Sequence, residues 1–149
     1  MIVLIKKIKM IIEDKIIWRE NWLASINELT NFILQKKSWL DRTQINPHWS
    51  FIEFTCSYFD DSFINNYEYQ IENRLITNQE FEIIKNWHEA LYNYNSPNKD
   101  DYNHEAILND ENWINILNLG KKTKLKLSKI LSDKEKQILN EEIDYLKFR

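Results

Sequence analysis

The chain has 149 residues, a length that fits one domain with a substantial core. Its residues are 43% hydrophobic and 29% charged, a balance that excludes an intrinsically disordered chain, and its formal net charge is only −3. One glycine and two prolines leave few positions for tight turns, so the composition favours helices over β-hairpins.

Large rings are expected to fill much of the core, since the chain has six tryptophans, seven tyrosines and seven phenylalanines. We therefore predict an all-α fold, a single compact domain of about five to seven helices with an aromatic-rich core, over residues 1–149. Residues 1–12 are treated as an N-terminal extension, and residues 1–9 drop out if Met10 is the start.

The N-terminal segment does not have the pattern of a signal peptide. Only four apolar residues separate Met1 from its lysines, whereas a signal peptide places charge first and then about 7–15 apolar residues. No stretch approaches the roughly 20 apolar residues of a membrane span. The single cysteine, Cys56, cannot form an internal disulfide and is interpreted as a buried, inert thiol. We expect a cytoplasmic protein.

The first half of the chain predicts two helices. Apolar residues recur at spacings of three and four over residues 13–37, which indicates one amphipathic helix. The stretch "NPHWSFIEFTCSYFDD" follows a break, with Asn46 as the helix cap and Pro47 in the first turn. A strand over residues 50–59 is the alternative, but its alternation mixes polar and aromatic residues on both faces, so helix is preferred.

Capping signals predict three helices in the second half. The sequence "TNQE", from Thr77 to Glu80, has the form of a capping box, and "SDKE" at residues 132–135 repeats it. Between them, Asp110 is expected to cap a helix that Gly120 ends as the residue after its last turn. Residues 94–103 are expected to form a loop.

Charge is unevenly distributed along the chain. Residues 50–112 carry three basic and thirteen acidic side chains, whereas the segments before and after them are mildly basic. These carboxylates either pair with cations once the chain folds, or form an acidic face that attracts a basic protein. The candidate partner-binding residues are Asp60, Asp61, Asp100, Asp101, Tyr102, Glu105, Asp110 and Glu111.

The three histidines were considered as metal ligands. His48, His88 and His104 lie in separate segments, and the sequence contains neither HExxH nor a repeated Glu-x-x-His pattern. His48 and His88 are interpreted as partly buried rings and His104 as a loop or capping residue. A metal site assembled from these three segments with Glu53 is the alternative.

Other catalytic arrangements are weakly indicated. The pair Asp60 and Asp61 at a helix end is typical of solvated carboxylates, and Cys56 lacks a neighbouring positive charge that would activate its thiol. We predict no catalytic residue, no metal and no cofactor. The five lysines of residues 120–129 have no interleaved aromatic rings, so they indicate a solvated helix face and no direct binding of nucleic acid.

The stretches "NPHWSFIEFTCSYFDD" and "FEIIKNWHEALYNYNSPNKDDYNHEAILNDENW", with the basic tail after them, resemble the small bacterial immunity proteins of polymorphic toxin systems, including contact-dependent growth inhibition. The resemblance covers roughly residues 38–119 and carries over no functional residue. It implies a cytosolic, single-domain, non-enzymatic protein that binds a cognate toxin domain. Many such toxins are basic nucleases, which an acidic face would occlude.

Two kinds of function therefore follow as hypotheses. The first is an immunity protein whose acidic middle, with exposed rings such as Tyr92, Tyr94 and Tyr102, covers a basic toxin. The alternative is a small metal-binding protein or enzyme that uses the three histidines, or a helical adaptor with a partner that is not a toxin.

Overall fold

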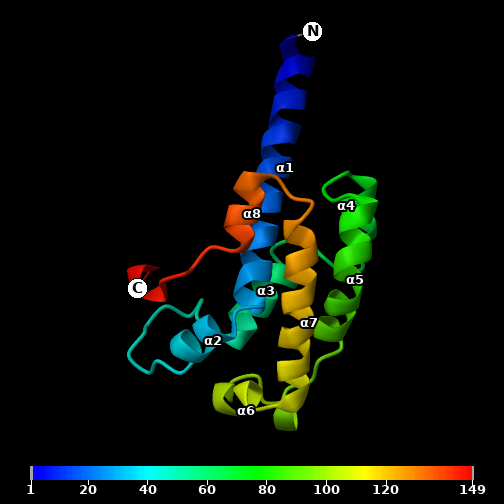
Figure 1. The fold of residues 1–149 in the computed structure, drawn as a ribbon. Helices are drawn as coiled ribbons and strands as arrows, with labels where there is room; N and C mark the ends of the chain where they lie inside the picture. The colour runs from blue at the N-terminus through cyan, green and yellow to red at the C-terminus, as the bar shows by residue number, and fades with distance from the viewer. Residues whose placement is uncertain (1, 149) are drawn as a thin grey trace.

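A computed structural model describes the backbone of residues 2–148 and the side chains of residues 12–147. Within these residues the fold is entirely helical, with eight α-helices, two short 3₁₀ helices and no strand, which confirms the predicted fold class (Figure 1). The α-helices are α1 (Ile2–Leu29), α2 (Phe32–Trp39), α3 (Phe51–Phe59), α4 (Glu68–Glu72), α5 (Asn78–Tyr92), α6 (His104–Leu108), α7 (Glu111–Ser128) and α8 (Asp133–Leu139). The 3₁₀ helices are η1 (Pro97–Lys99) and η2 (Tyr145–Phe148).

Helix α1 is the central element of the domain. Helices α2, α3, α7 and α8 pack against it, and α5 packs along the far side of α7. The first turns of α1 project beyond the other helices, while the short helix α6 lies at the opposite end (Figure 1). None of the helices in the described part of the chain is both long and apolar enough to cross a membrane.

The core is built from aromatic rings, as predicted. Its largest fully buried side chains include Trp22, Trp87, Trp113, Tyr58 and Phe54. Many of these rings meet edge to face, an arrangement that adds about 0.5–1.5 kcal/mol per pair beyond the burial of apolar area. Rings on α3 contact Trp39 of α2, Trp87 of α5 and Trp113 of α7, and so hold that helix against its neighbours.

Predicted helix boundaries in the first half were wrong, and the helix expected to begin at residue 13 already begins at Ile2. The helix expected over residues 13–37 is divided, because the side chain of Asn31 accepts a hydrogen bond from the amide of Leu34 and starts α2. The next helix starts at Phe51, where Ser50 is the cap. Asn46 instead accepts a bond from the amide of His48 in a turn.

Gly120 does not end a helix, because α7 continues to Ser128. A Cβ atom on Gly120 would lie 2.7 Å from Cγ2 of Thr30 and 2.8 Å from Nε1 of Trp87. The glycine thus allows α7 to approach α1 and α5 closely. Gly120 is therefore required by tertiary contacts, which the local sequence does not reveal.

The two predicted capping boxes differ in the structure. In α5, the Thr77 side chain accepts a bond from the amide of Glu80, and the Glu80 carboxylate accepts one from the Thr77 amide. In α8, Ser132 caps the amide of Glu135. The Glu135 carboxylate, however, pairs with Arg19 of α1.

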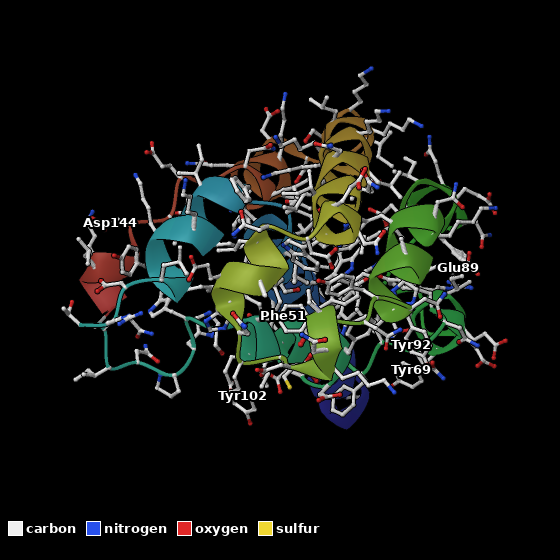
Figure 2. The ribbon with its side chains drawn as sticks, turned by 90° about the horizontal axis from the view of Figure 1, so that it is seen from below. Phe51, Tyr69, Glu89, Tyr92, Tyr102 and Asp144 are labelled. Atoms are coloured by element: carbon white, nitrogen blue, oxygen red, sulfur yellow. The ribbon has the colours of Figure 1, made fainter. Side chains whose placement is uncertain are left out.

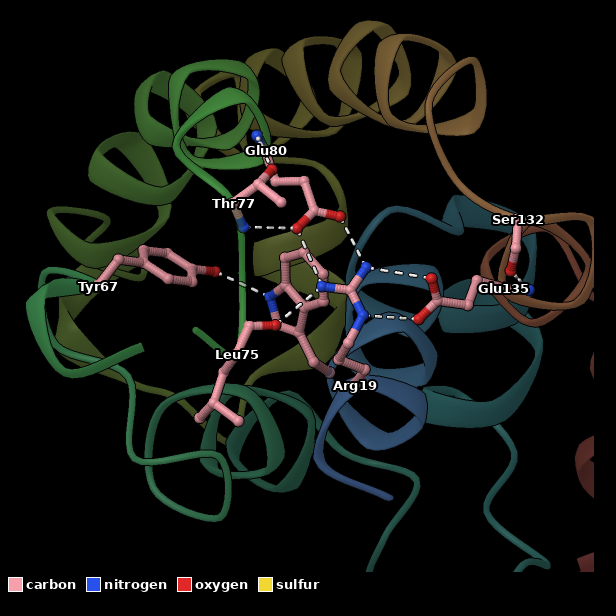
Figure 3. A network of polar contacts seen from close by, with 8 residues as sticks. Arg19, Tyr67, Leu75, Thr77, Glu80, Ser132 and Glu135 are labelled. Atoms are coloured by element: carbon pink, nitrogen blue, oxygen red, sulfur yellow. Dashed lines mark hydrogen bonds and ion pairs between the residues drawn. The ribbon is translucent and has the colours of Figure 1, made fainter. Parts of the chain in front are cut away.

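Arg19 joins three helices at one point (Figure 3). Its guanidinium donates two hydrogen bonds to the Glu80 carboxylate, two to the Glu135 carboxylate and one to the carbonyl of Leu75. Burial favours the neutral form of Glu80, but the bonds from Arg19 and Thr77 outweigh it and lower the pKa of this carboxyl. The network fixes the start of α5 and of α8 against α1.

Candidate protein-binding surface

The acidic middle of the chain stays unpaired after folding. Of its thirteen acidic side chains, only Glu80 and Glu82 form an ion pair with a lysine or arginine among the residues that the structure describes. Glu80 is buried against Arg19, and Glu82 pairs with Lys85 one turn away. The other carboxylates, half-buried or exposed, keep a local excess of negative charge.

A first acidic group lies around the outer face of α3. Asp60 and Asp61 are exposed at the end of this helix, and Glu53 is exposed about two turns earlier. Cys56 is half-buried and not fully buried as expected. Partial burial raises the pKa of its thiol, and the hydrogen bond and charge of Asp60, with the charges of Glu53 and Asp61, raise it further. The thiol therefore stays protonated at neutral pH, which argues against a nucleophile here.

A second acidic group lies where the chain runs from η1 to α6. The carboxylate of Asp100 accepts the amide of Tyr102, and the carboxylate of Asp101 accepts the hydroxyl of buried Ser96 at 2.6 Å. Glu105 is exposed on α6, where no hydrogen bond or ion pair engages its carboxylate within the described residues. The loop geometry thus depends on Asp100 and Asp101, whereas Glu105 is free to meet a partner.

Asp110 serves the fold as well as the surface charge. One carboxylate oxygen accepts the amide of Asn112 as the cap of α7, which confirms the predicted cap, and the other accepts the hydroxyl of Tyr94 at 2.7 Å. Burial, the bond to Asp110 and its charge raise the pKa of Tyr94. Asp110 is half-buried, whereas its neighbour Glu111 is exposed.

The tyrosines predicted at the interface differ in exposure. Tyr102 is 81% exposed and Tyr92 is 60% exposed, whereas Tyr94 is half-buried against Trp113. Seen from below, Tyr92 lies with Tyr69 and Glu89 on one side of the molecule, and Tyr102 projects elsewhere (Figure 2). The surface therefore has two exposed aromatic points rather than one.

A groove of about 400 Å³ borders the second acidic group. It runs between α3 and the segment from the end of α5 to η1, and it is lined by Thr55, Phe59, Tyr92, Lys99 and Asp101, among others. Lys99 is the basic side chain on this border. The groove therefore places one face of α3 next to the loop that carries Asp101, but Glu53, Asp60 and Asp61 do not line it.

The structure separates the three histidines. His48 contacts Glu28 at 2.6 Å, His104 lies between Trp39 and the start of α3, and His88 lies in the core. No group of three or more histidine, cysteine or acidic side chains that could hold a metal ion occurs among the described residues. The alternative metal site is therefore not assembled in this fold.

His104 has a defined structural role at the start of α3. Its Nε2 accepts the free amide of Phe51 at 3.1 Å, which requires that its Nδ1 carry the proton and donate to the carbonyl of Trp39 at 3.2 Å. Burial lowers the pKa of His104 and keeps the ring neutral. This histidine completes the cap that Ser50 begins.

His88 ends a chain of buried hydrogen bonds. Its Nε2 lies 2.5 Å from the carbonyl of Asn65 and must donate to it, so Nδ1 accepts the hydroxyl of Tyr58 at 2.8 Å. Tyr67 then donates to Tyr58 and accepts the indole N–H of Trp22. Burial lowers the pKa of His88, and protonation would leave one hydroxyl of this chain without an acceptor.

Sequence reasoning missed two exposed rings, one in the segment after α3 and one on α4. Phe63 is 75% exposed with a φ of 56°, and Tyr69 is 59% exposed. A left-handed backbone at a phenylalanine is uncommon, and the side chain of Gln70 supports it by donating to the Phe63 carbonyl. No periodic pattern marks this segment, so its exposure was not predictable.

The lysines of residues 120–129 lie at the other end of α7 from the second acidic group (Figure 1). Lys124 is half-buried and donates to Asn27 at 2.7 Å, and burial lowers its pKa to about 8. The remaining four are exposed, as the predicted solvated face requires. Acidic and basic side chains are thus separated along this helix.

Comparisons with models of protein families, with curated proteins and with solved structures gave no match to this chain.

Proposed function

We propose that the protein is a cytoplasmic immunity protein that binds and neutralises a cognate toxin domain with a basic surface. The observation that carries the proposal is the unpaired negative charge of residues 50–112, in which only Glu80 and Glu82 have a cationic partner among the described residues. Such an excess of one sign attracts a basic partner and speeds its encounter.

The exposed rings supply binding energy beyond that of the charges. Tyr92 and Tyr102 are large, rigid side chains at the border of the acidic surface, and aromatic residues of this kind contribute much of the binding energy at protein interfaces. The carboxylates then favour a basic cleft over a neutral one. Binding is expected to weaken as salt is added, since exposed charges are screened beyond about 8 Å at physiological ionic strength.

The first experiment is to purify the tagged protein from its native host and to identify any stoichiometric partner by mass spectrometry, with a metal assay on the same sample. A basic toxin domain supports the proposal. A partner without toxic activity would favour the adaptor instead, and one bound metal with no partner would favour the metal protein.

Charge reversal then tests the acidic surface. Asp61, Glu105 and Glu111 suit this test because they are exposed and have no role in the described hydrogen-bond network other than through their backbone. Changing all three to lysine is expected to slow association at least tenfold at low salt.

The matched control reverses Glu13, Glu141 and Glu142, which are exposed elsewhere and change the net charge equally. Equal slowing by both triple variants would show that only net charge matters and would contradict the proposed surface. Circular dichroism checks that both variants remain helical.

A further inference from the structure

A cavity of about 620 Å³ lies on the outer face of α5, beside the loop that leads into α4. Its lining is dominated by amide and aromatic side chains, among them Asn65, Asn86, His88, Glu89, Tyr92 and Asn93. Of these residues, Tyr92 was expected at the interface as an exposed ring, and none belongs to the acidic set predicted from the charge pattern. The cavity adjoins the acidic end of α3, because Phe59 of that helix contacts Tyr92.

The rim of this cavity offers hydrogen-bond acceptors that the fold does not use. The side-chain amides of Asn65, Asn86 and Asn93 and the carboxylate of Glu89 form no hydrogen bond or ion pair within the described residues. Lys85 also lines the cavity, but its ammonium is 2.7 Å from the carboxylate of Glu82. The uncompensated charge at the rim is therefore negative.

The aromatic wall of the cavity, formed by Tyr92 and His88, is rigid. The ring of Tyr92 stacks on His88 at a centroid distance of 6.5 Å and meets the edge of Phe59 at 5.9 Å, yet it remains 60% exposed. His88 is held in turn by its bonds to Tyr58 and to the carbonyl of Asn65. A ring fixed in this way loses little conformational entropy when a ligand stacks on it.

The wall is also uncharged. Both nitrogens of His88 are engaged in a pattern that requires the neutral ring, with Nε2 donating and Nδ1 accepting. A protonated histidine here would repel a cation. The neutral ring instead leaves Glu89 as the unpaired charge among the residues of α5 that line the cavity.

We propose that this cavity receives an arginine side chain of the basic protein partner, with the guanidinium stacked on Tyr92 and hydrogen-bonded to Glu89 and the asparagine amide oxygens. An arginine suits the site better than a lysine, because a planar guanidinium stacks on a ring and offers five donors to several acceptors at once. The identity of the partner rests on the proposed function, whereas the chemistry of the cavity does not.

A titration with N-acetyl-arginine amide tests the cavity without the partner. Saturable shifts are expected in the ¹H–¹⁵N spectrum for the side-chain amides of Asn65, Asn86 and Asn93. The citrulline analogue, which has the same shape without charge, is expected to bind at least about threefold more weakly. Equal shifts with citrulline, or shifts spread over all acidic residues, would overturn the inference.

Two variants locate the binding. Glu89→Gln and Tyr92→Ala are each expected to weaken arginine-amide binding about threefold or more, whereas the control Glu105→Gln leaves it unchanged. Both positions are exposed, so the variants are expected to fold. Unchanged binding in both variants would refute the assignment.

The captured partner provides the second test. Glu89→Gln combined with Tyr92→Ala is expected to weaken its binding about 30-fold, the scale of an interface hot spot. If this double variant binds the partner with full affinity, while reversal of Asp61, Glu105 and Glu111 weakens binding, the arginine site in the cavity is refuted and the proposed function stays intact. If no basic partner exists, the proposed function fails, and the arginine titration still decides the cavity.

Discussion

Replacing Arg19 by lysine is expected to destabilise the protein although the positive charge is kept. A guanidinium has five N–H donors, and Arg19 uses all five, on two carboxylates and one carbonyl. A lysine ammonium has three donors at a single point. Arg19→Lys therefore leaves at least two acceptors unserved.

The size of the effect follows from the burial of the two carboxylates. The side chain of Glu80 is 5% exposed and that of Glu135 is 23% exposed, so water can replace a lost bond at Glu135 more readily than at Glu80. A hydrogen bond to a charged group contributes about 1.5–3 kcal/mol. With partial replacement by water, Arg19→Lys is expected to lower the free energy of unfolding by about 2 kcal/mol. Arg19→Met, which leaves both carboxylates unpaired, is expected to cost about 3–5 kcal/mol.

Urea unfolding followed by tryptophan fluorescence and circular dichroism measures these losses. Glu82→Gln is the control, because it removes an exposed ion pair with Lys85 and is expected to change stability by less than about 0.5 kcal/mol. If Arg19→Lys is as stable as the wild type, or if Arg19→Met is no worse than Arg19→Lys, the reasoning about shared donors is refuted.

Three further predictions concern the histidines and the glycine. The bond to Glu28 raises the pKa of His48 above its usual 6.5. His48 therefore stabilises the fold at low pH, and this contribution is lost as pH rises through the raised pKa. In urea unfolding, the loss of stability caused by His48→Asn is expected to be larger at about pH 5.5 than at about pH 8.5. Tyr58→Phe removes the donor to His88 and is expected to cost about 1–3 kcal/mol in the same assay, with stability unchanged if the chain of bonds is unimportant. Gly120→Ala is expected to cost about 1–2 kcal/mol despite a better helix propensity, because its Cβ would overlap Thr30. Adding Thr30→Ser, which keeps the hydroxyl but removes the methyl, is expected to recover part of this loss. A Gly120→Ala protein more stable than the wild type would contradict the close approach of the helices.

Local signals in the sequence predicted the parts of the fold that local physics decides. The capping box at Thr77 and the cap at Asp110 were recognisable because each depends on side chains within three residues of the helix start. The all-helical class likewise followed from apolar spacing and the scarcity of glycine and proline. Short helices such as α4 and α6 were missed, because one turn carries too little periodicity to be recognised.

Tertiary contacts decided the rest. The sequence around Gly120 has the form of a helix end, and only the proximity of Trp87 shows why a glycine is required in mid-helix. Likewise Glu135 was expected to complete its own cap, and its bond to Arg19, more than a hundred residues away, has no local signal. Such pairings depend on the packing of α1 against α8.

The candidate surface was predictable as a charge and not as a shape. The acidic block could be counted along the sequence, since sign and number do not depend on the fold. The gathering of Glu53 with Asp60 and Asp61 around Cys56, and the cavity beside Glu89, depend on how α3 and α5 pack. Both were beyond reach without the three-dimensional arrangement.

The separation of charge along α7 has a consequence for the protein on its own. Carboxylates gather near its first turn and exposed lysines near its last, so two copies attract each other when they meet head to tail. A contact of this kind does not close on itself and can add further copies in a row. Light scattering is therefore expected to reveal reversible chains of the protein in dilute buffer, which dissolve once salt reduces the Debye length to about 8 Å.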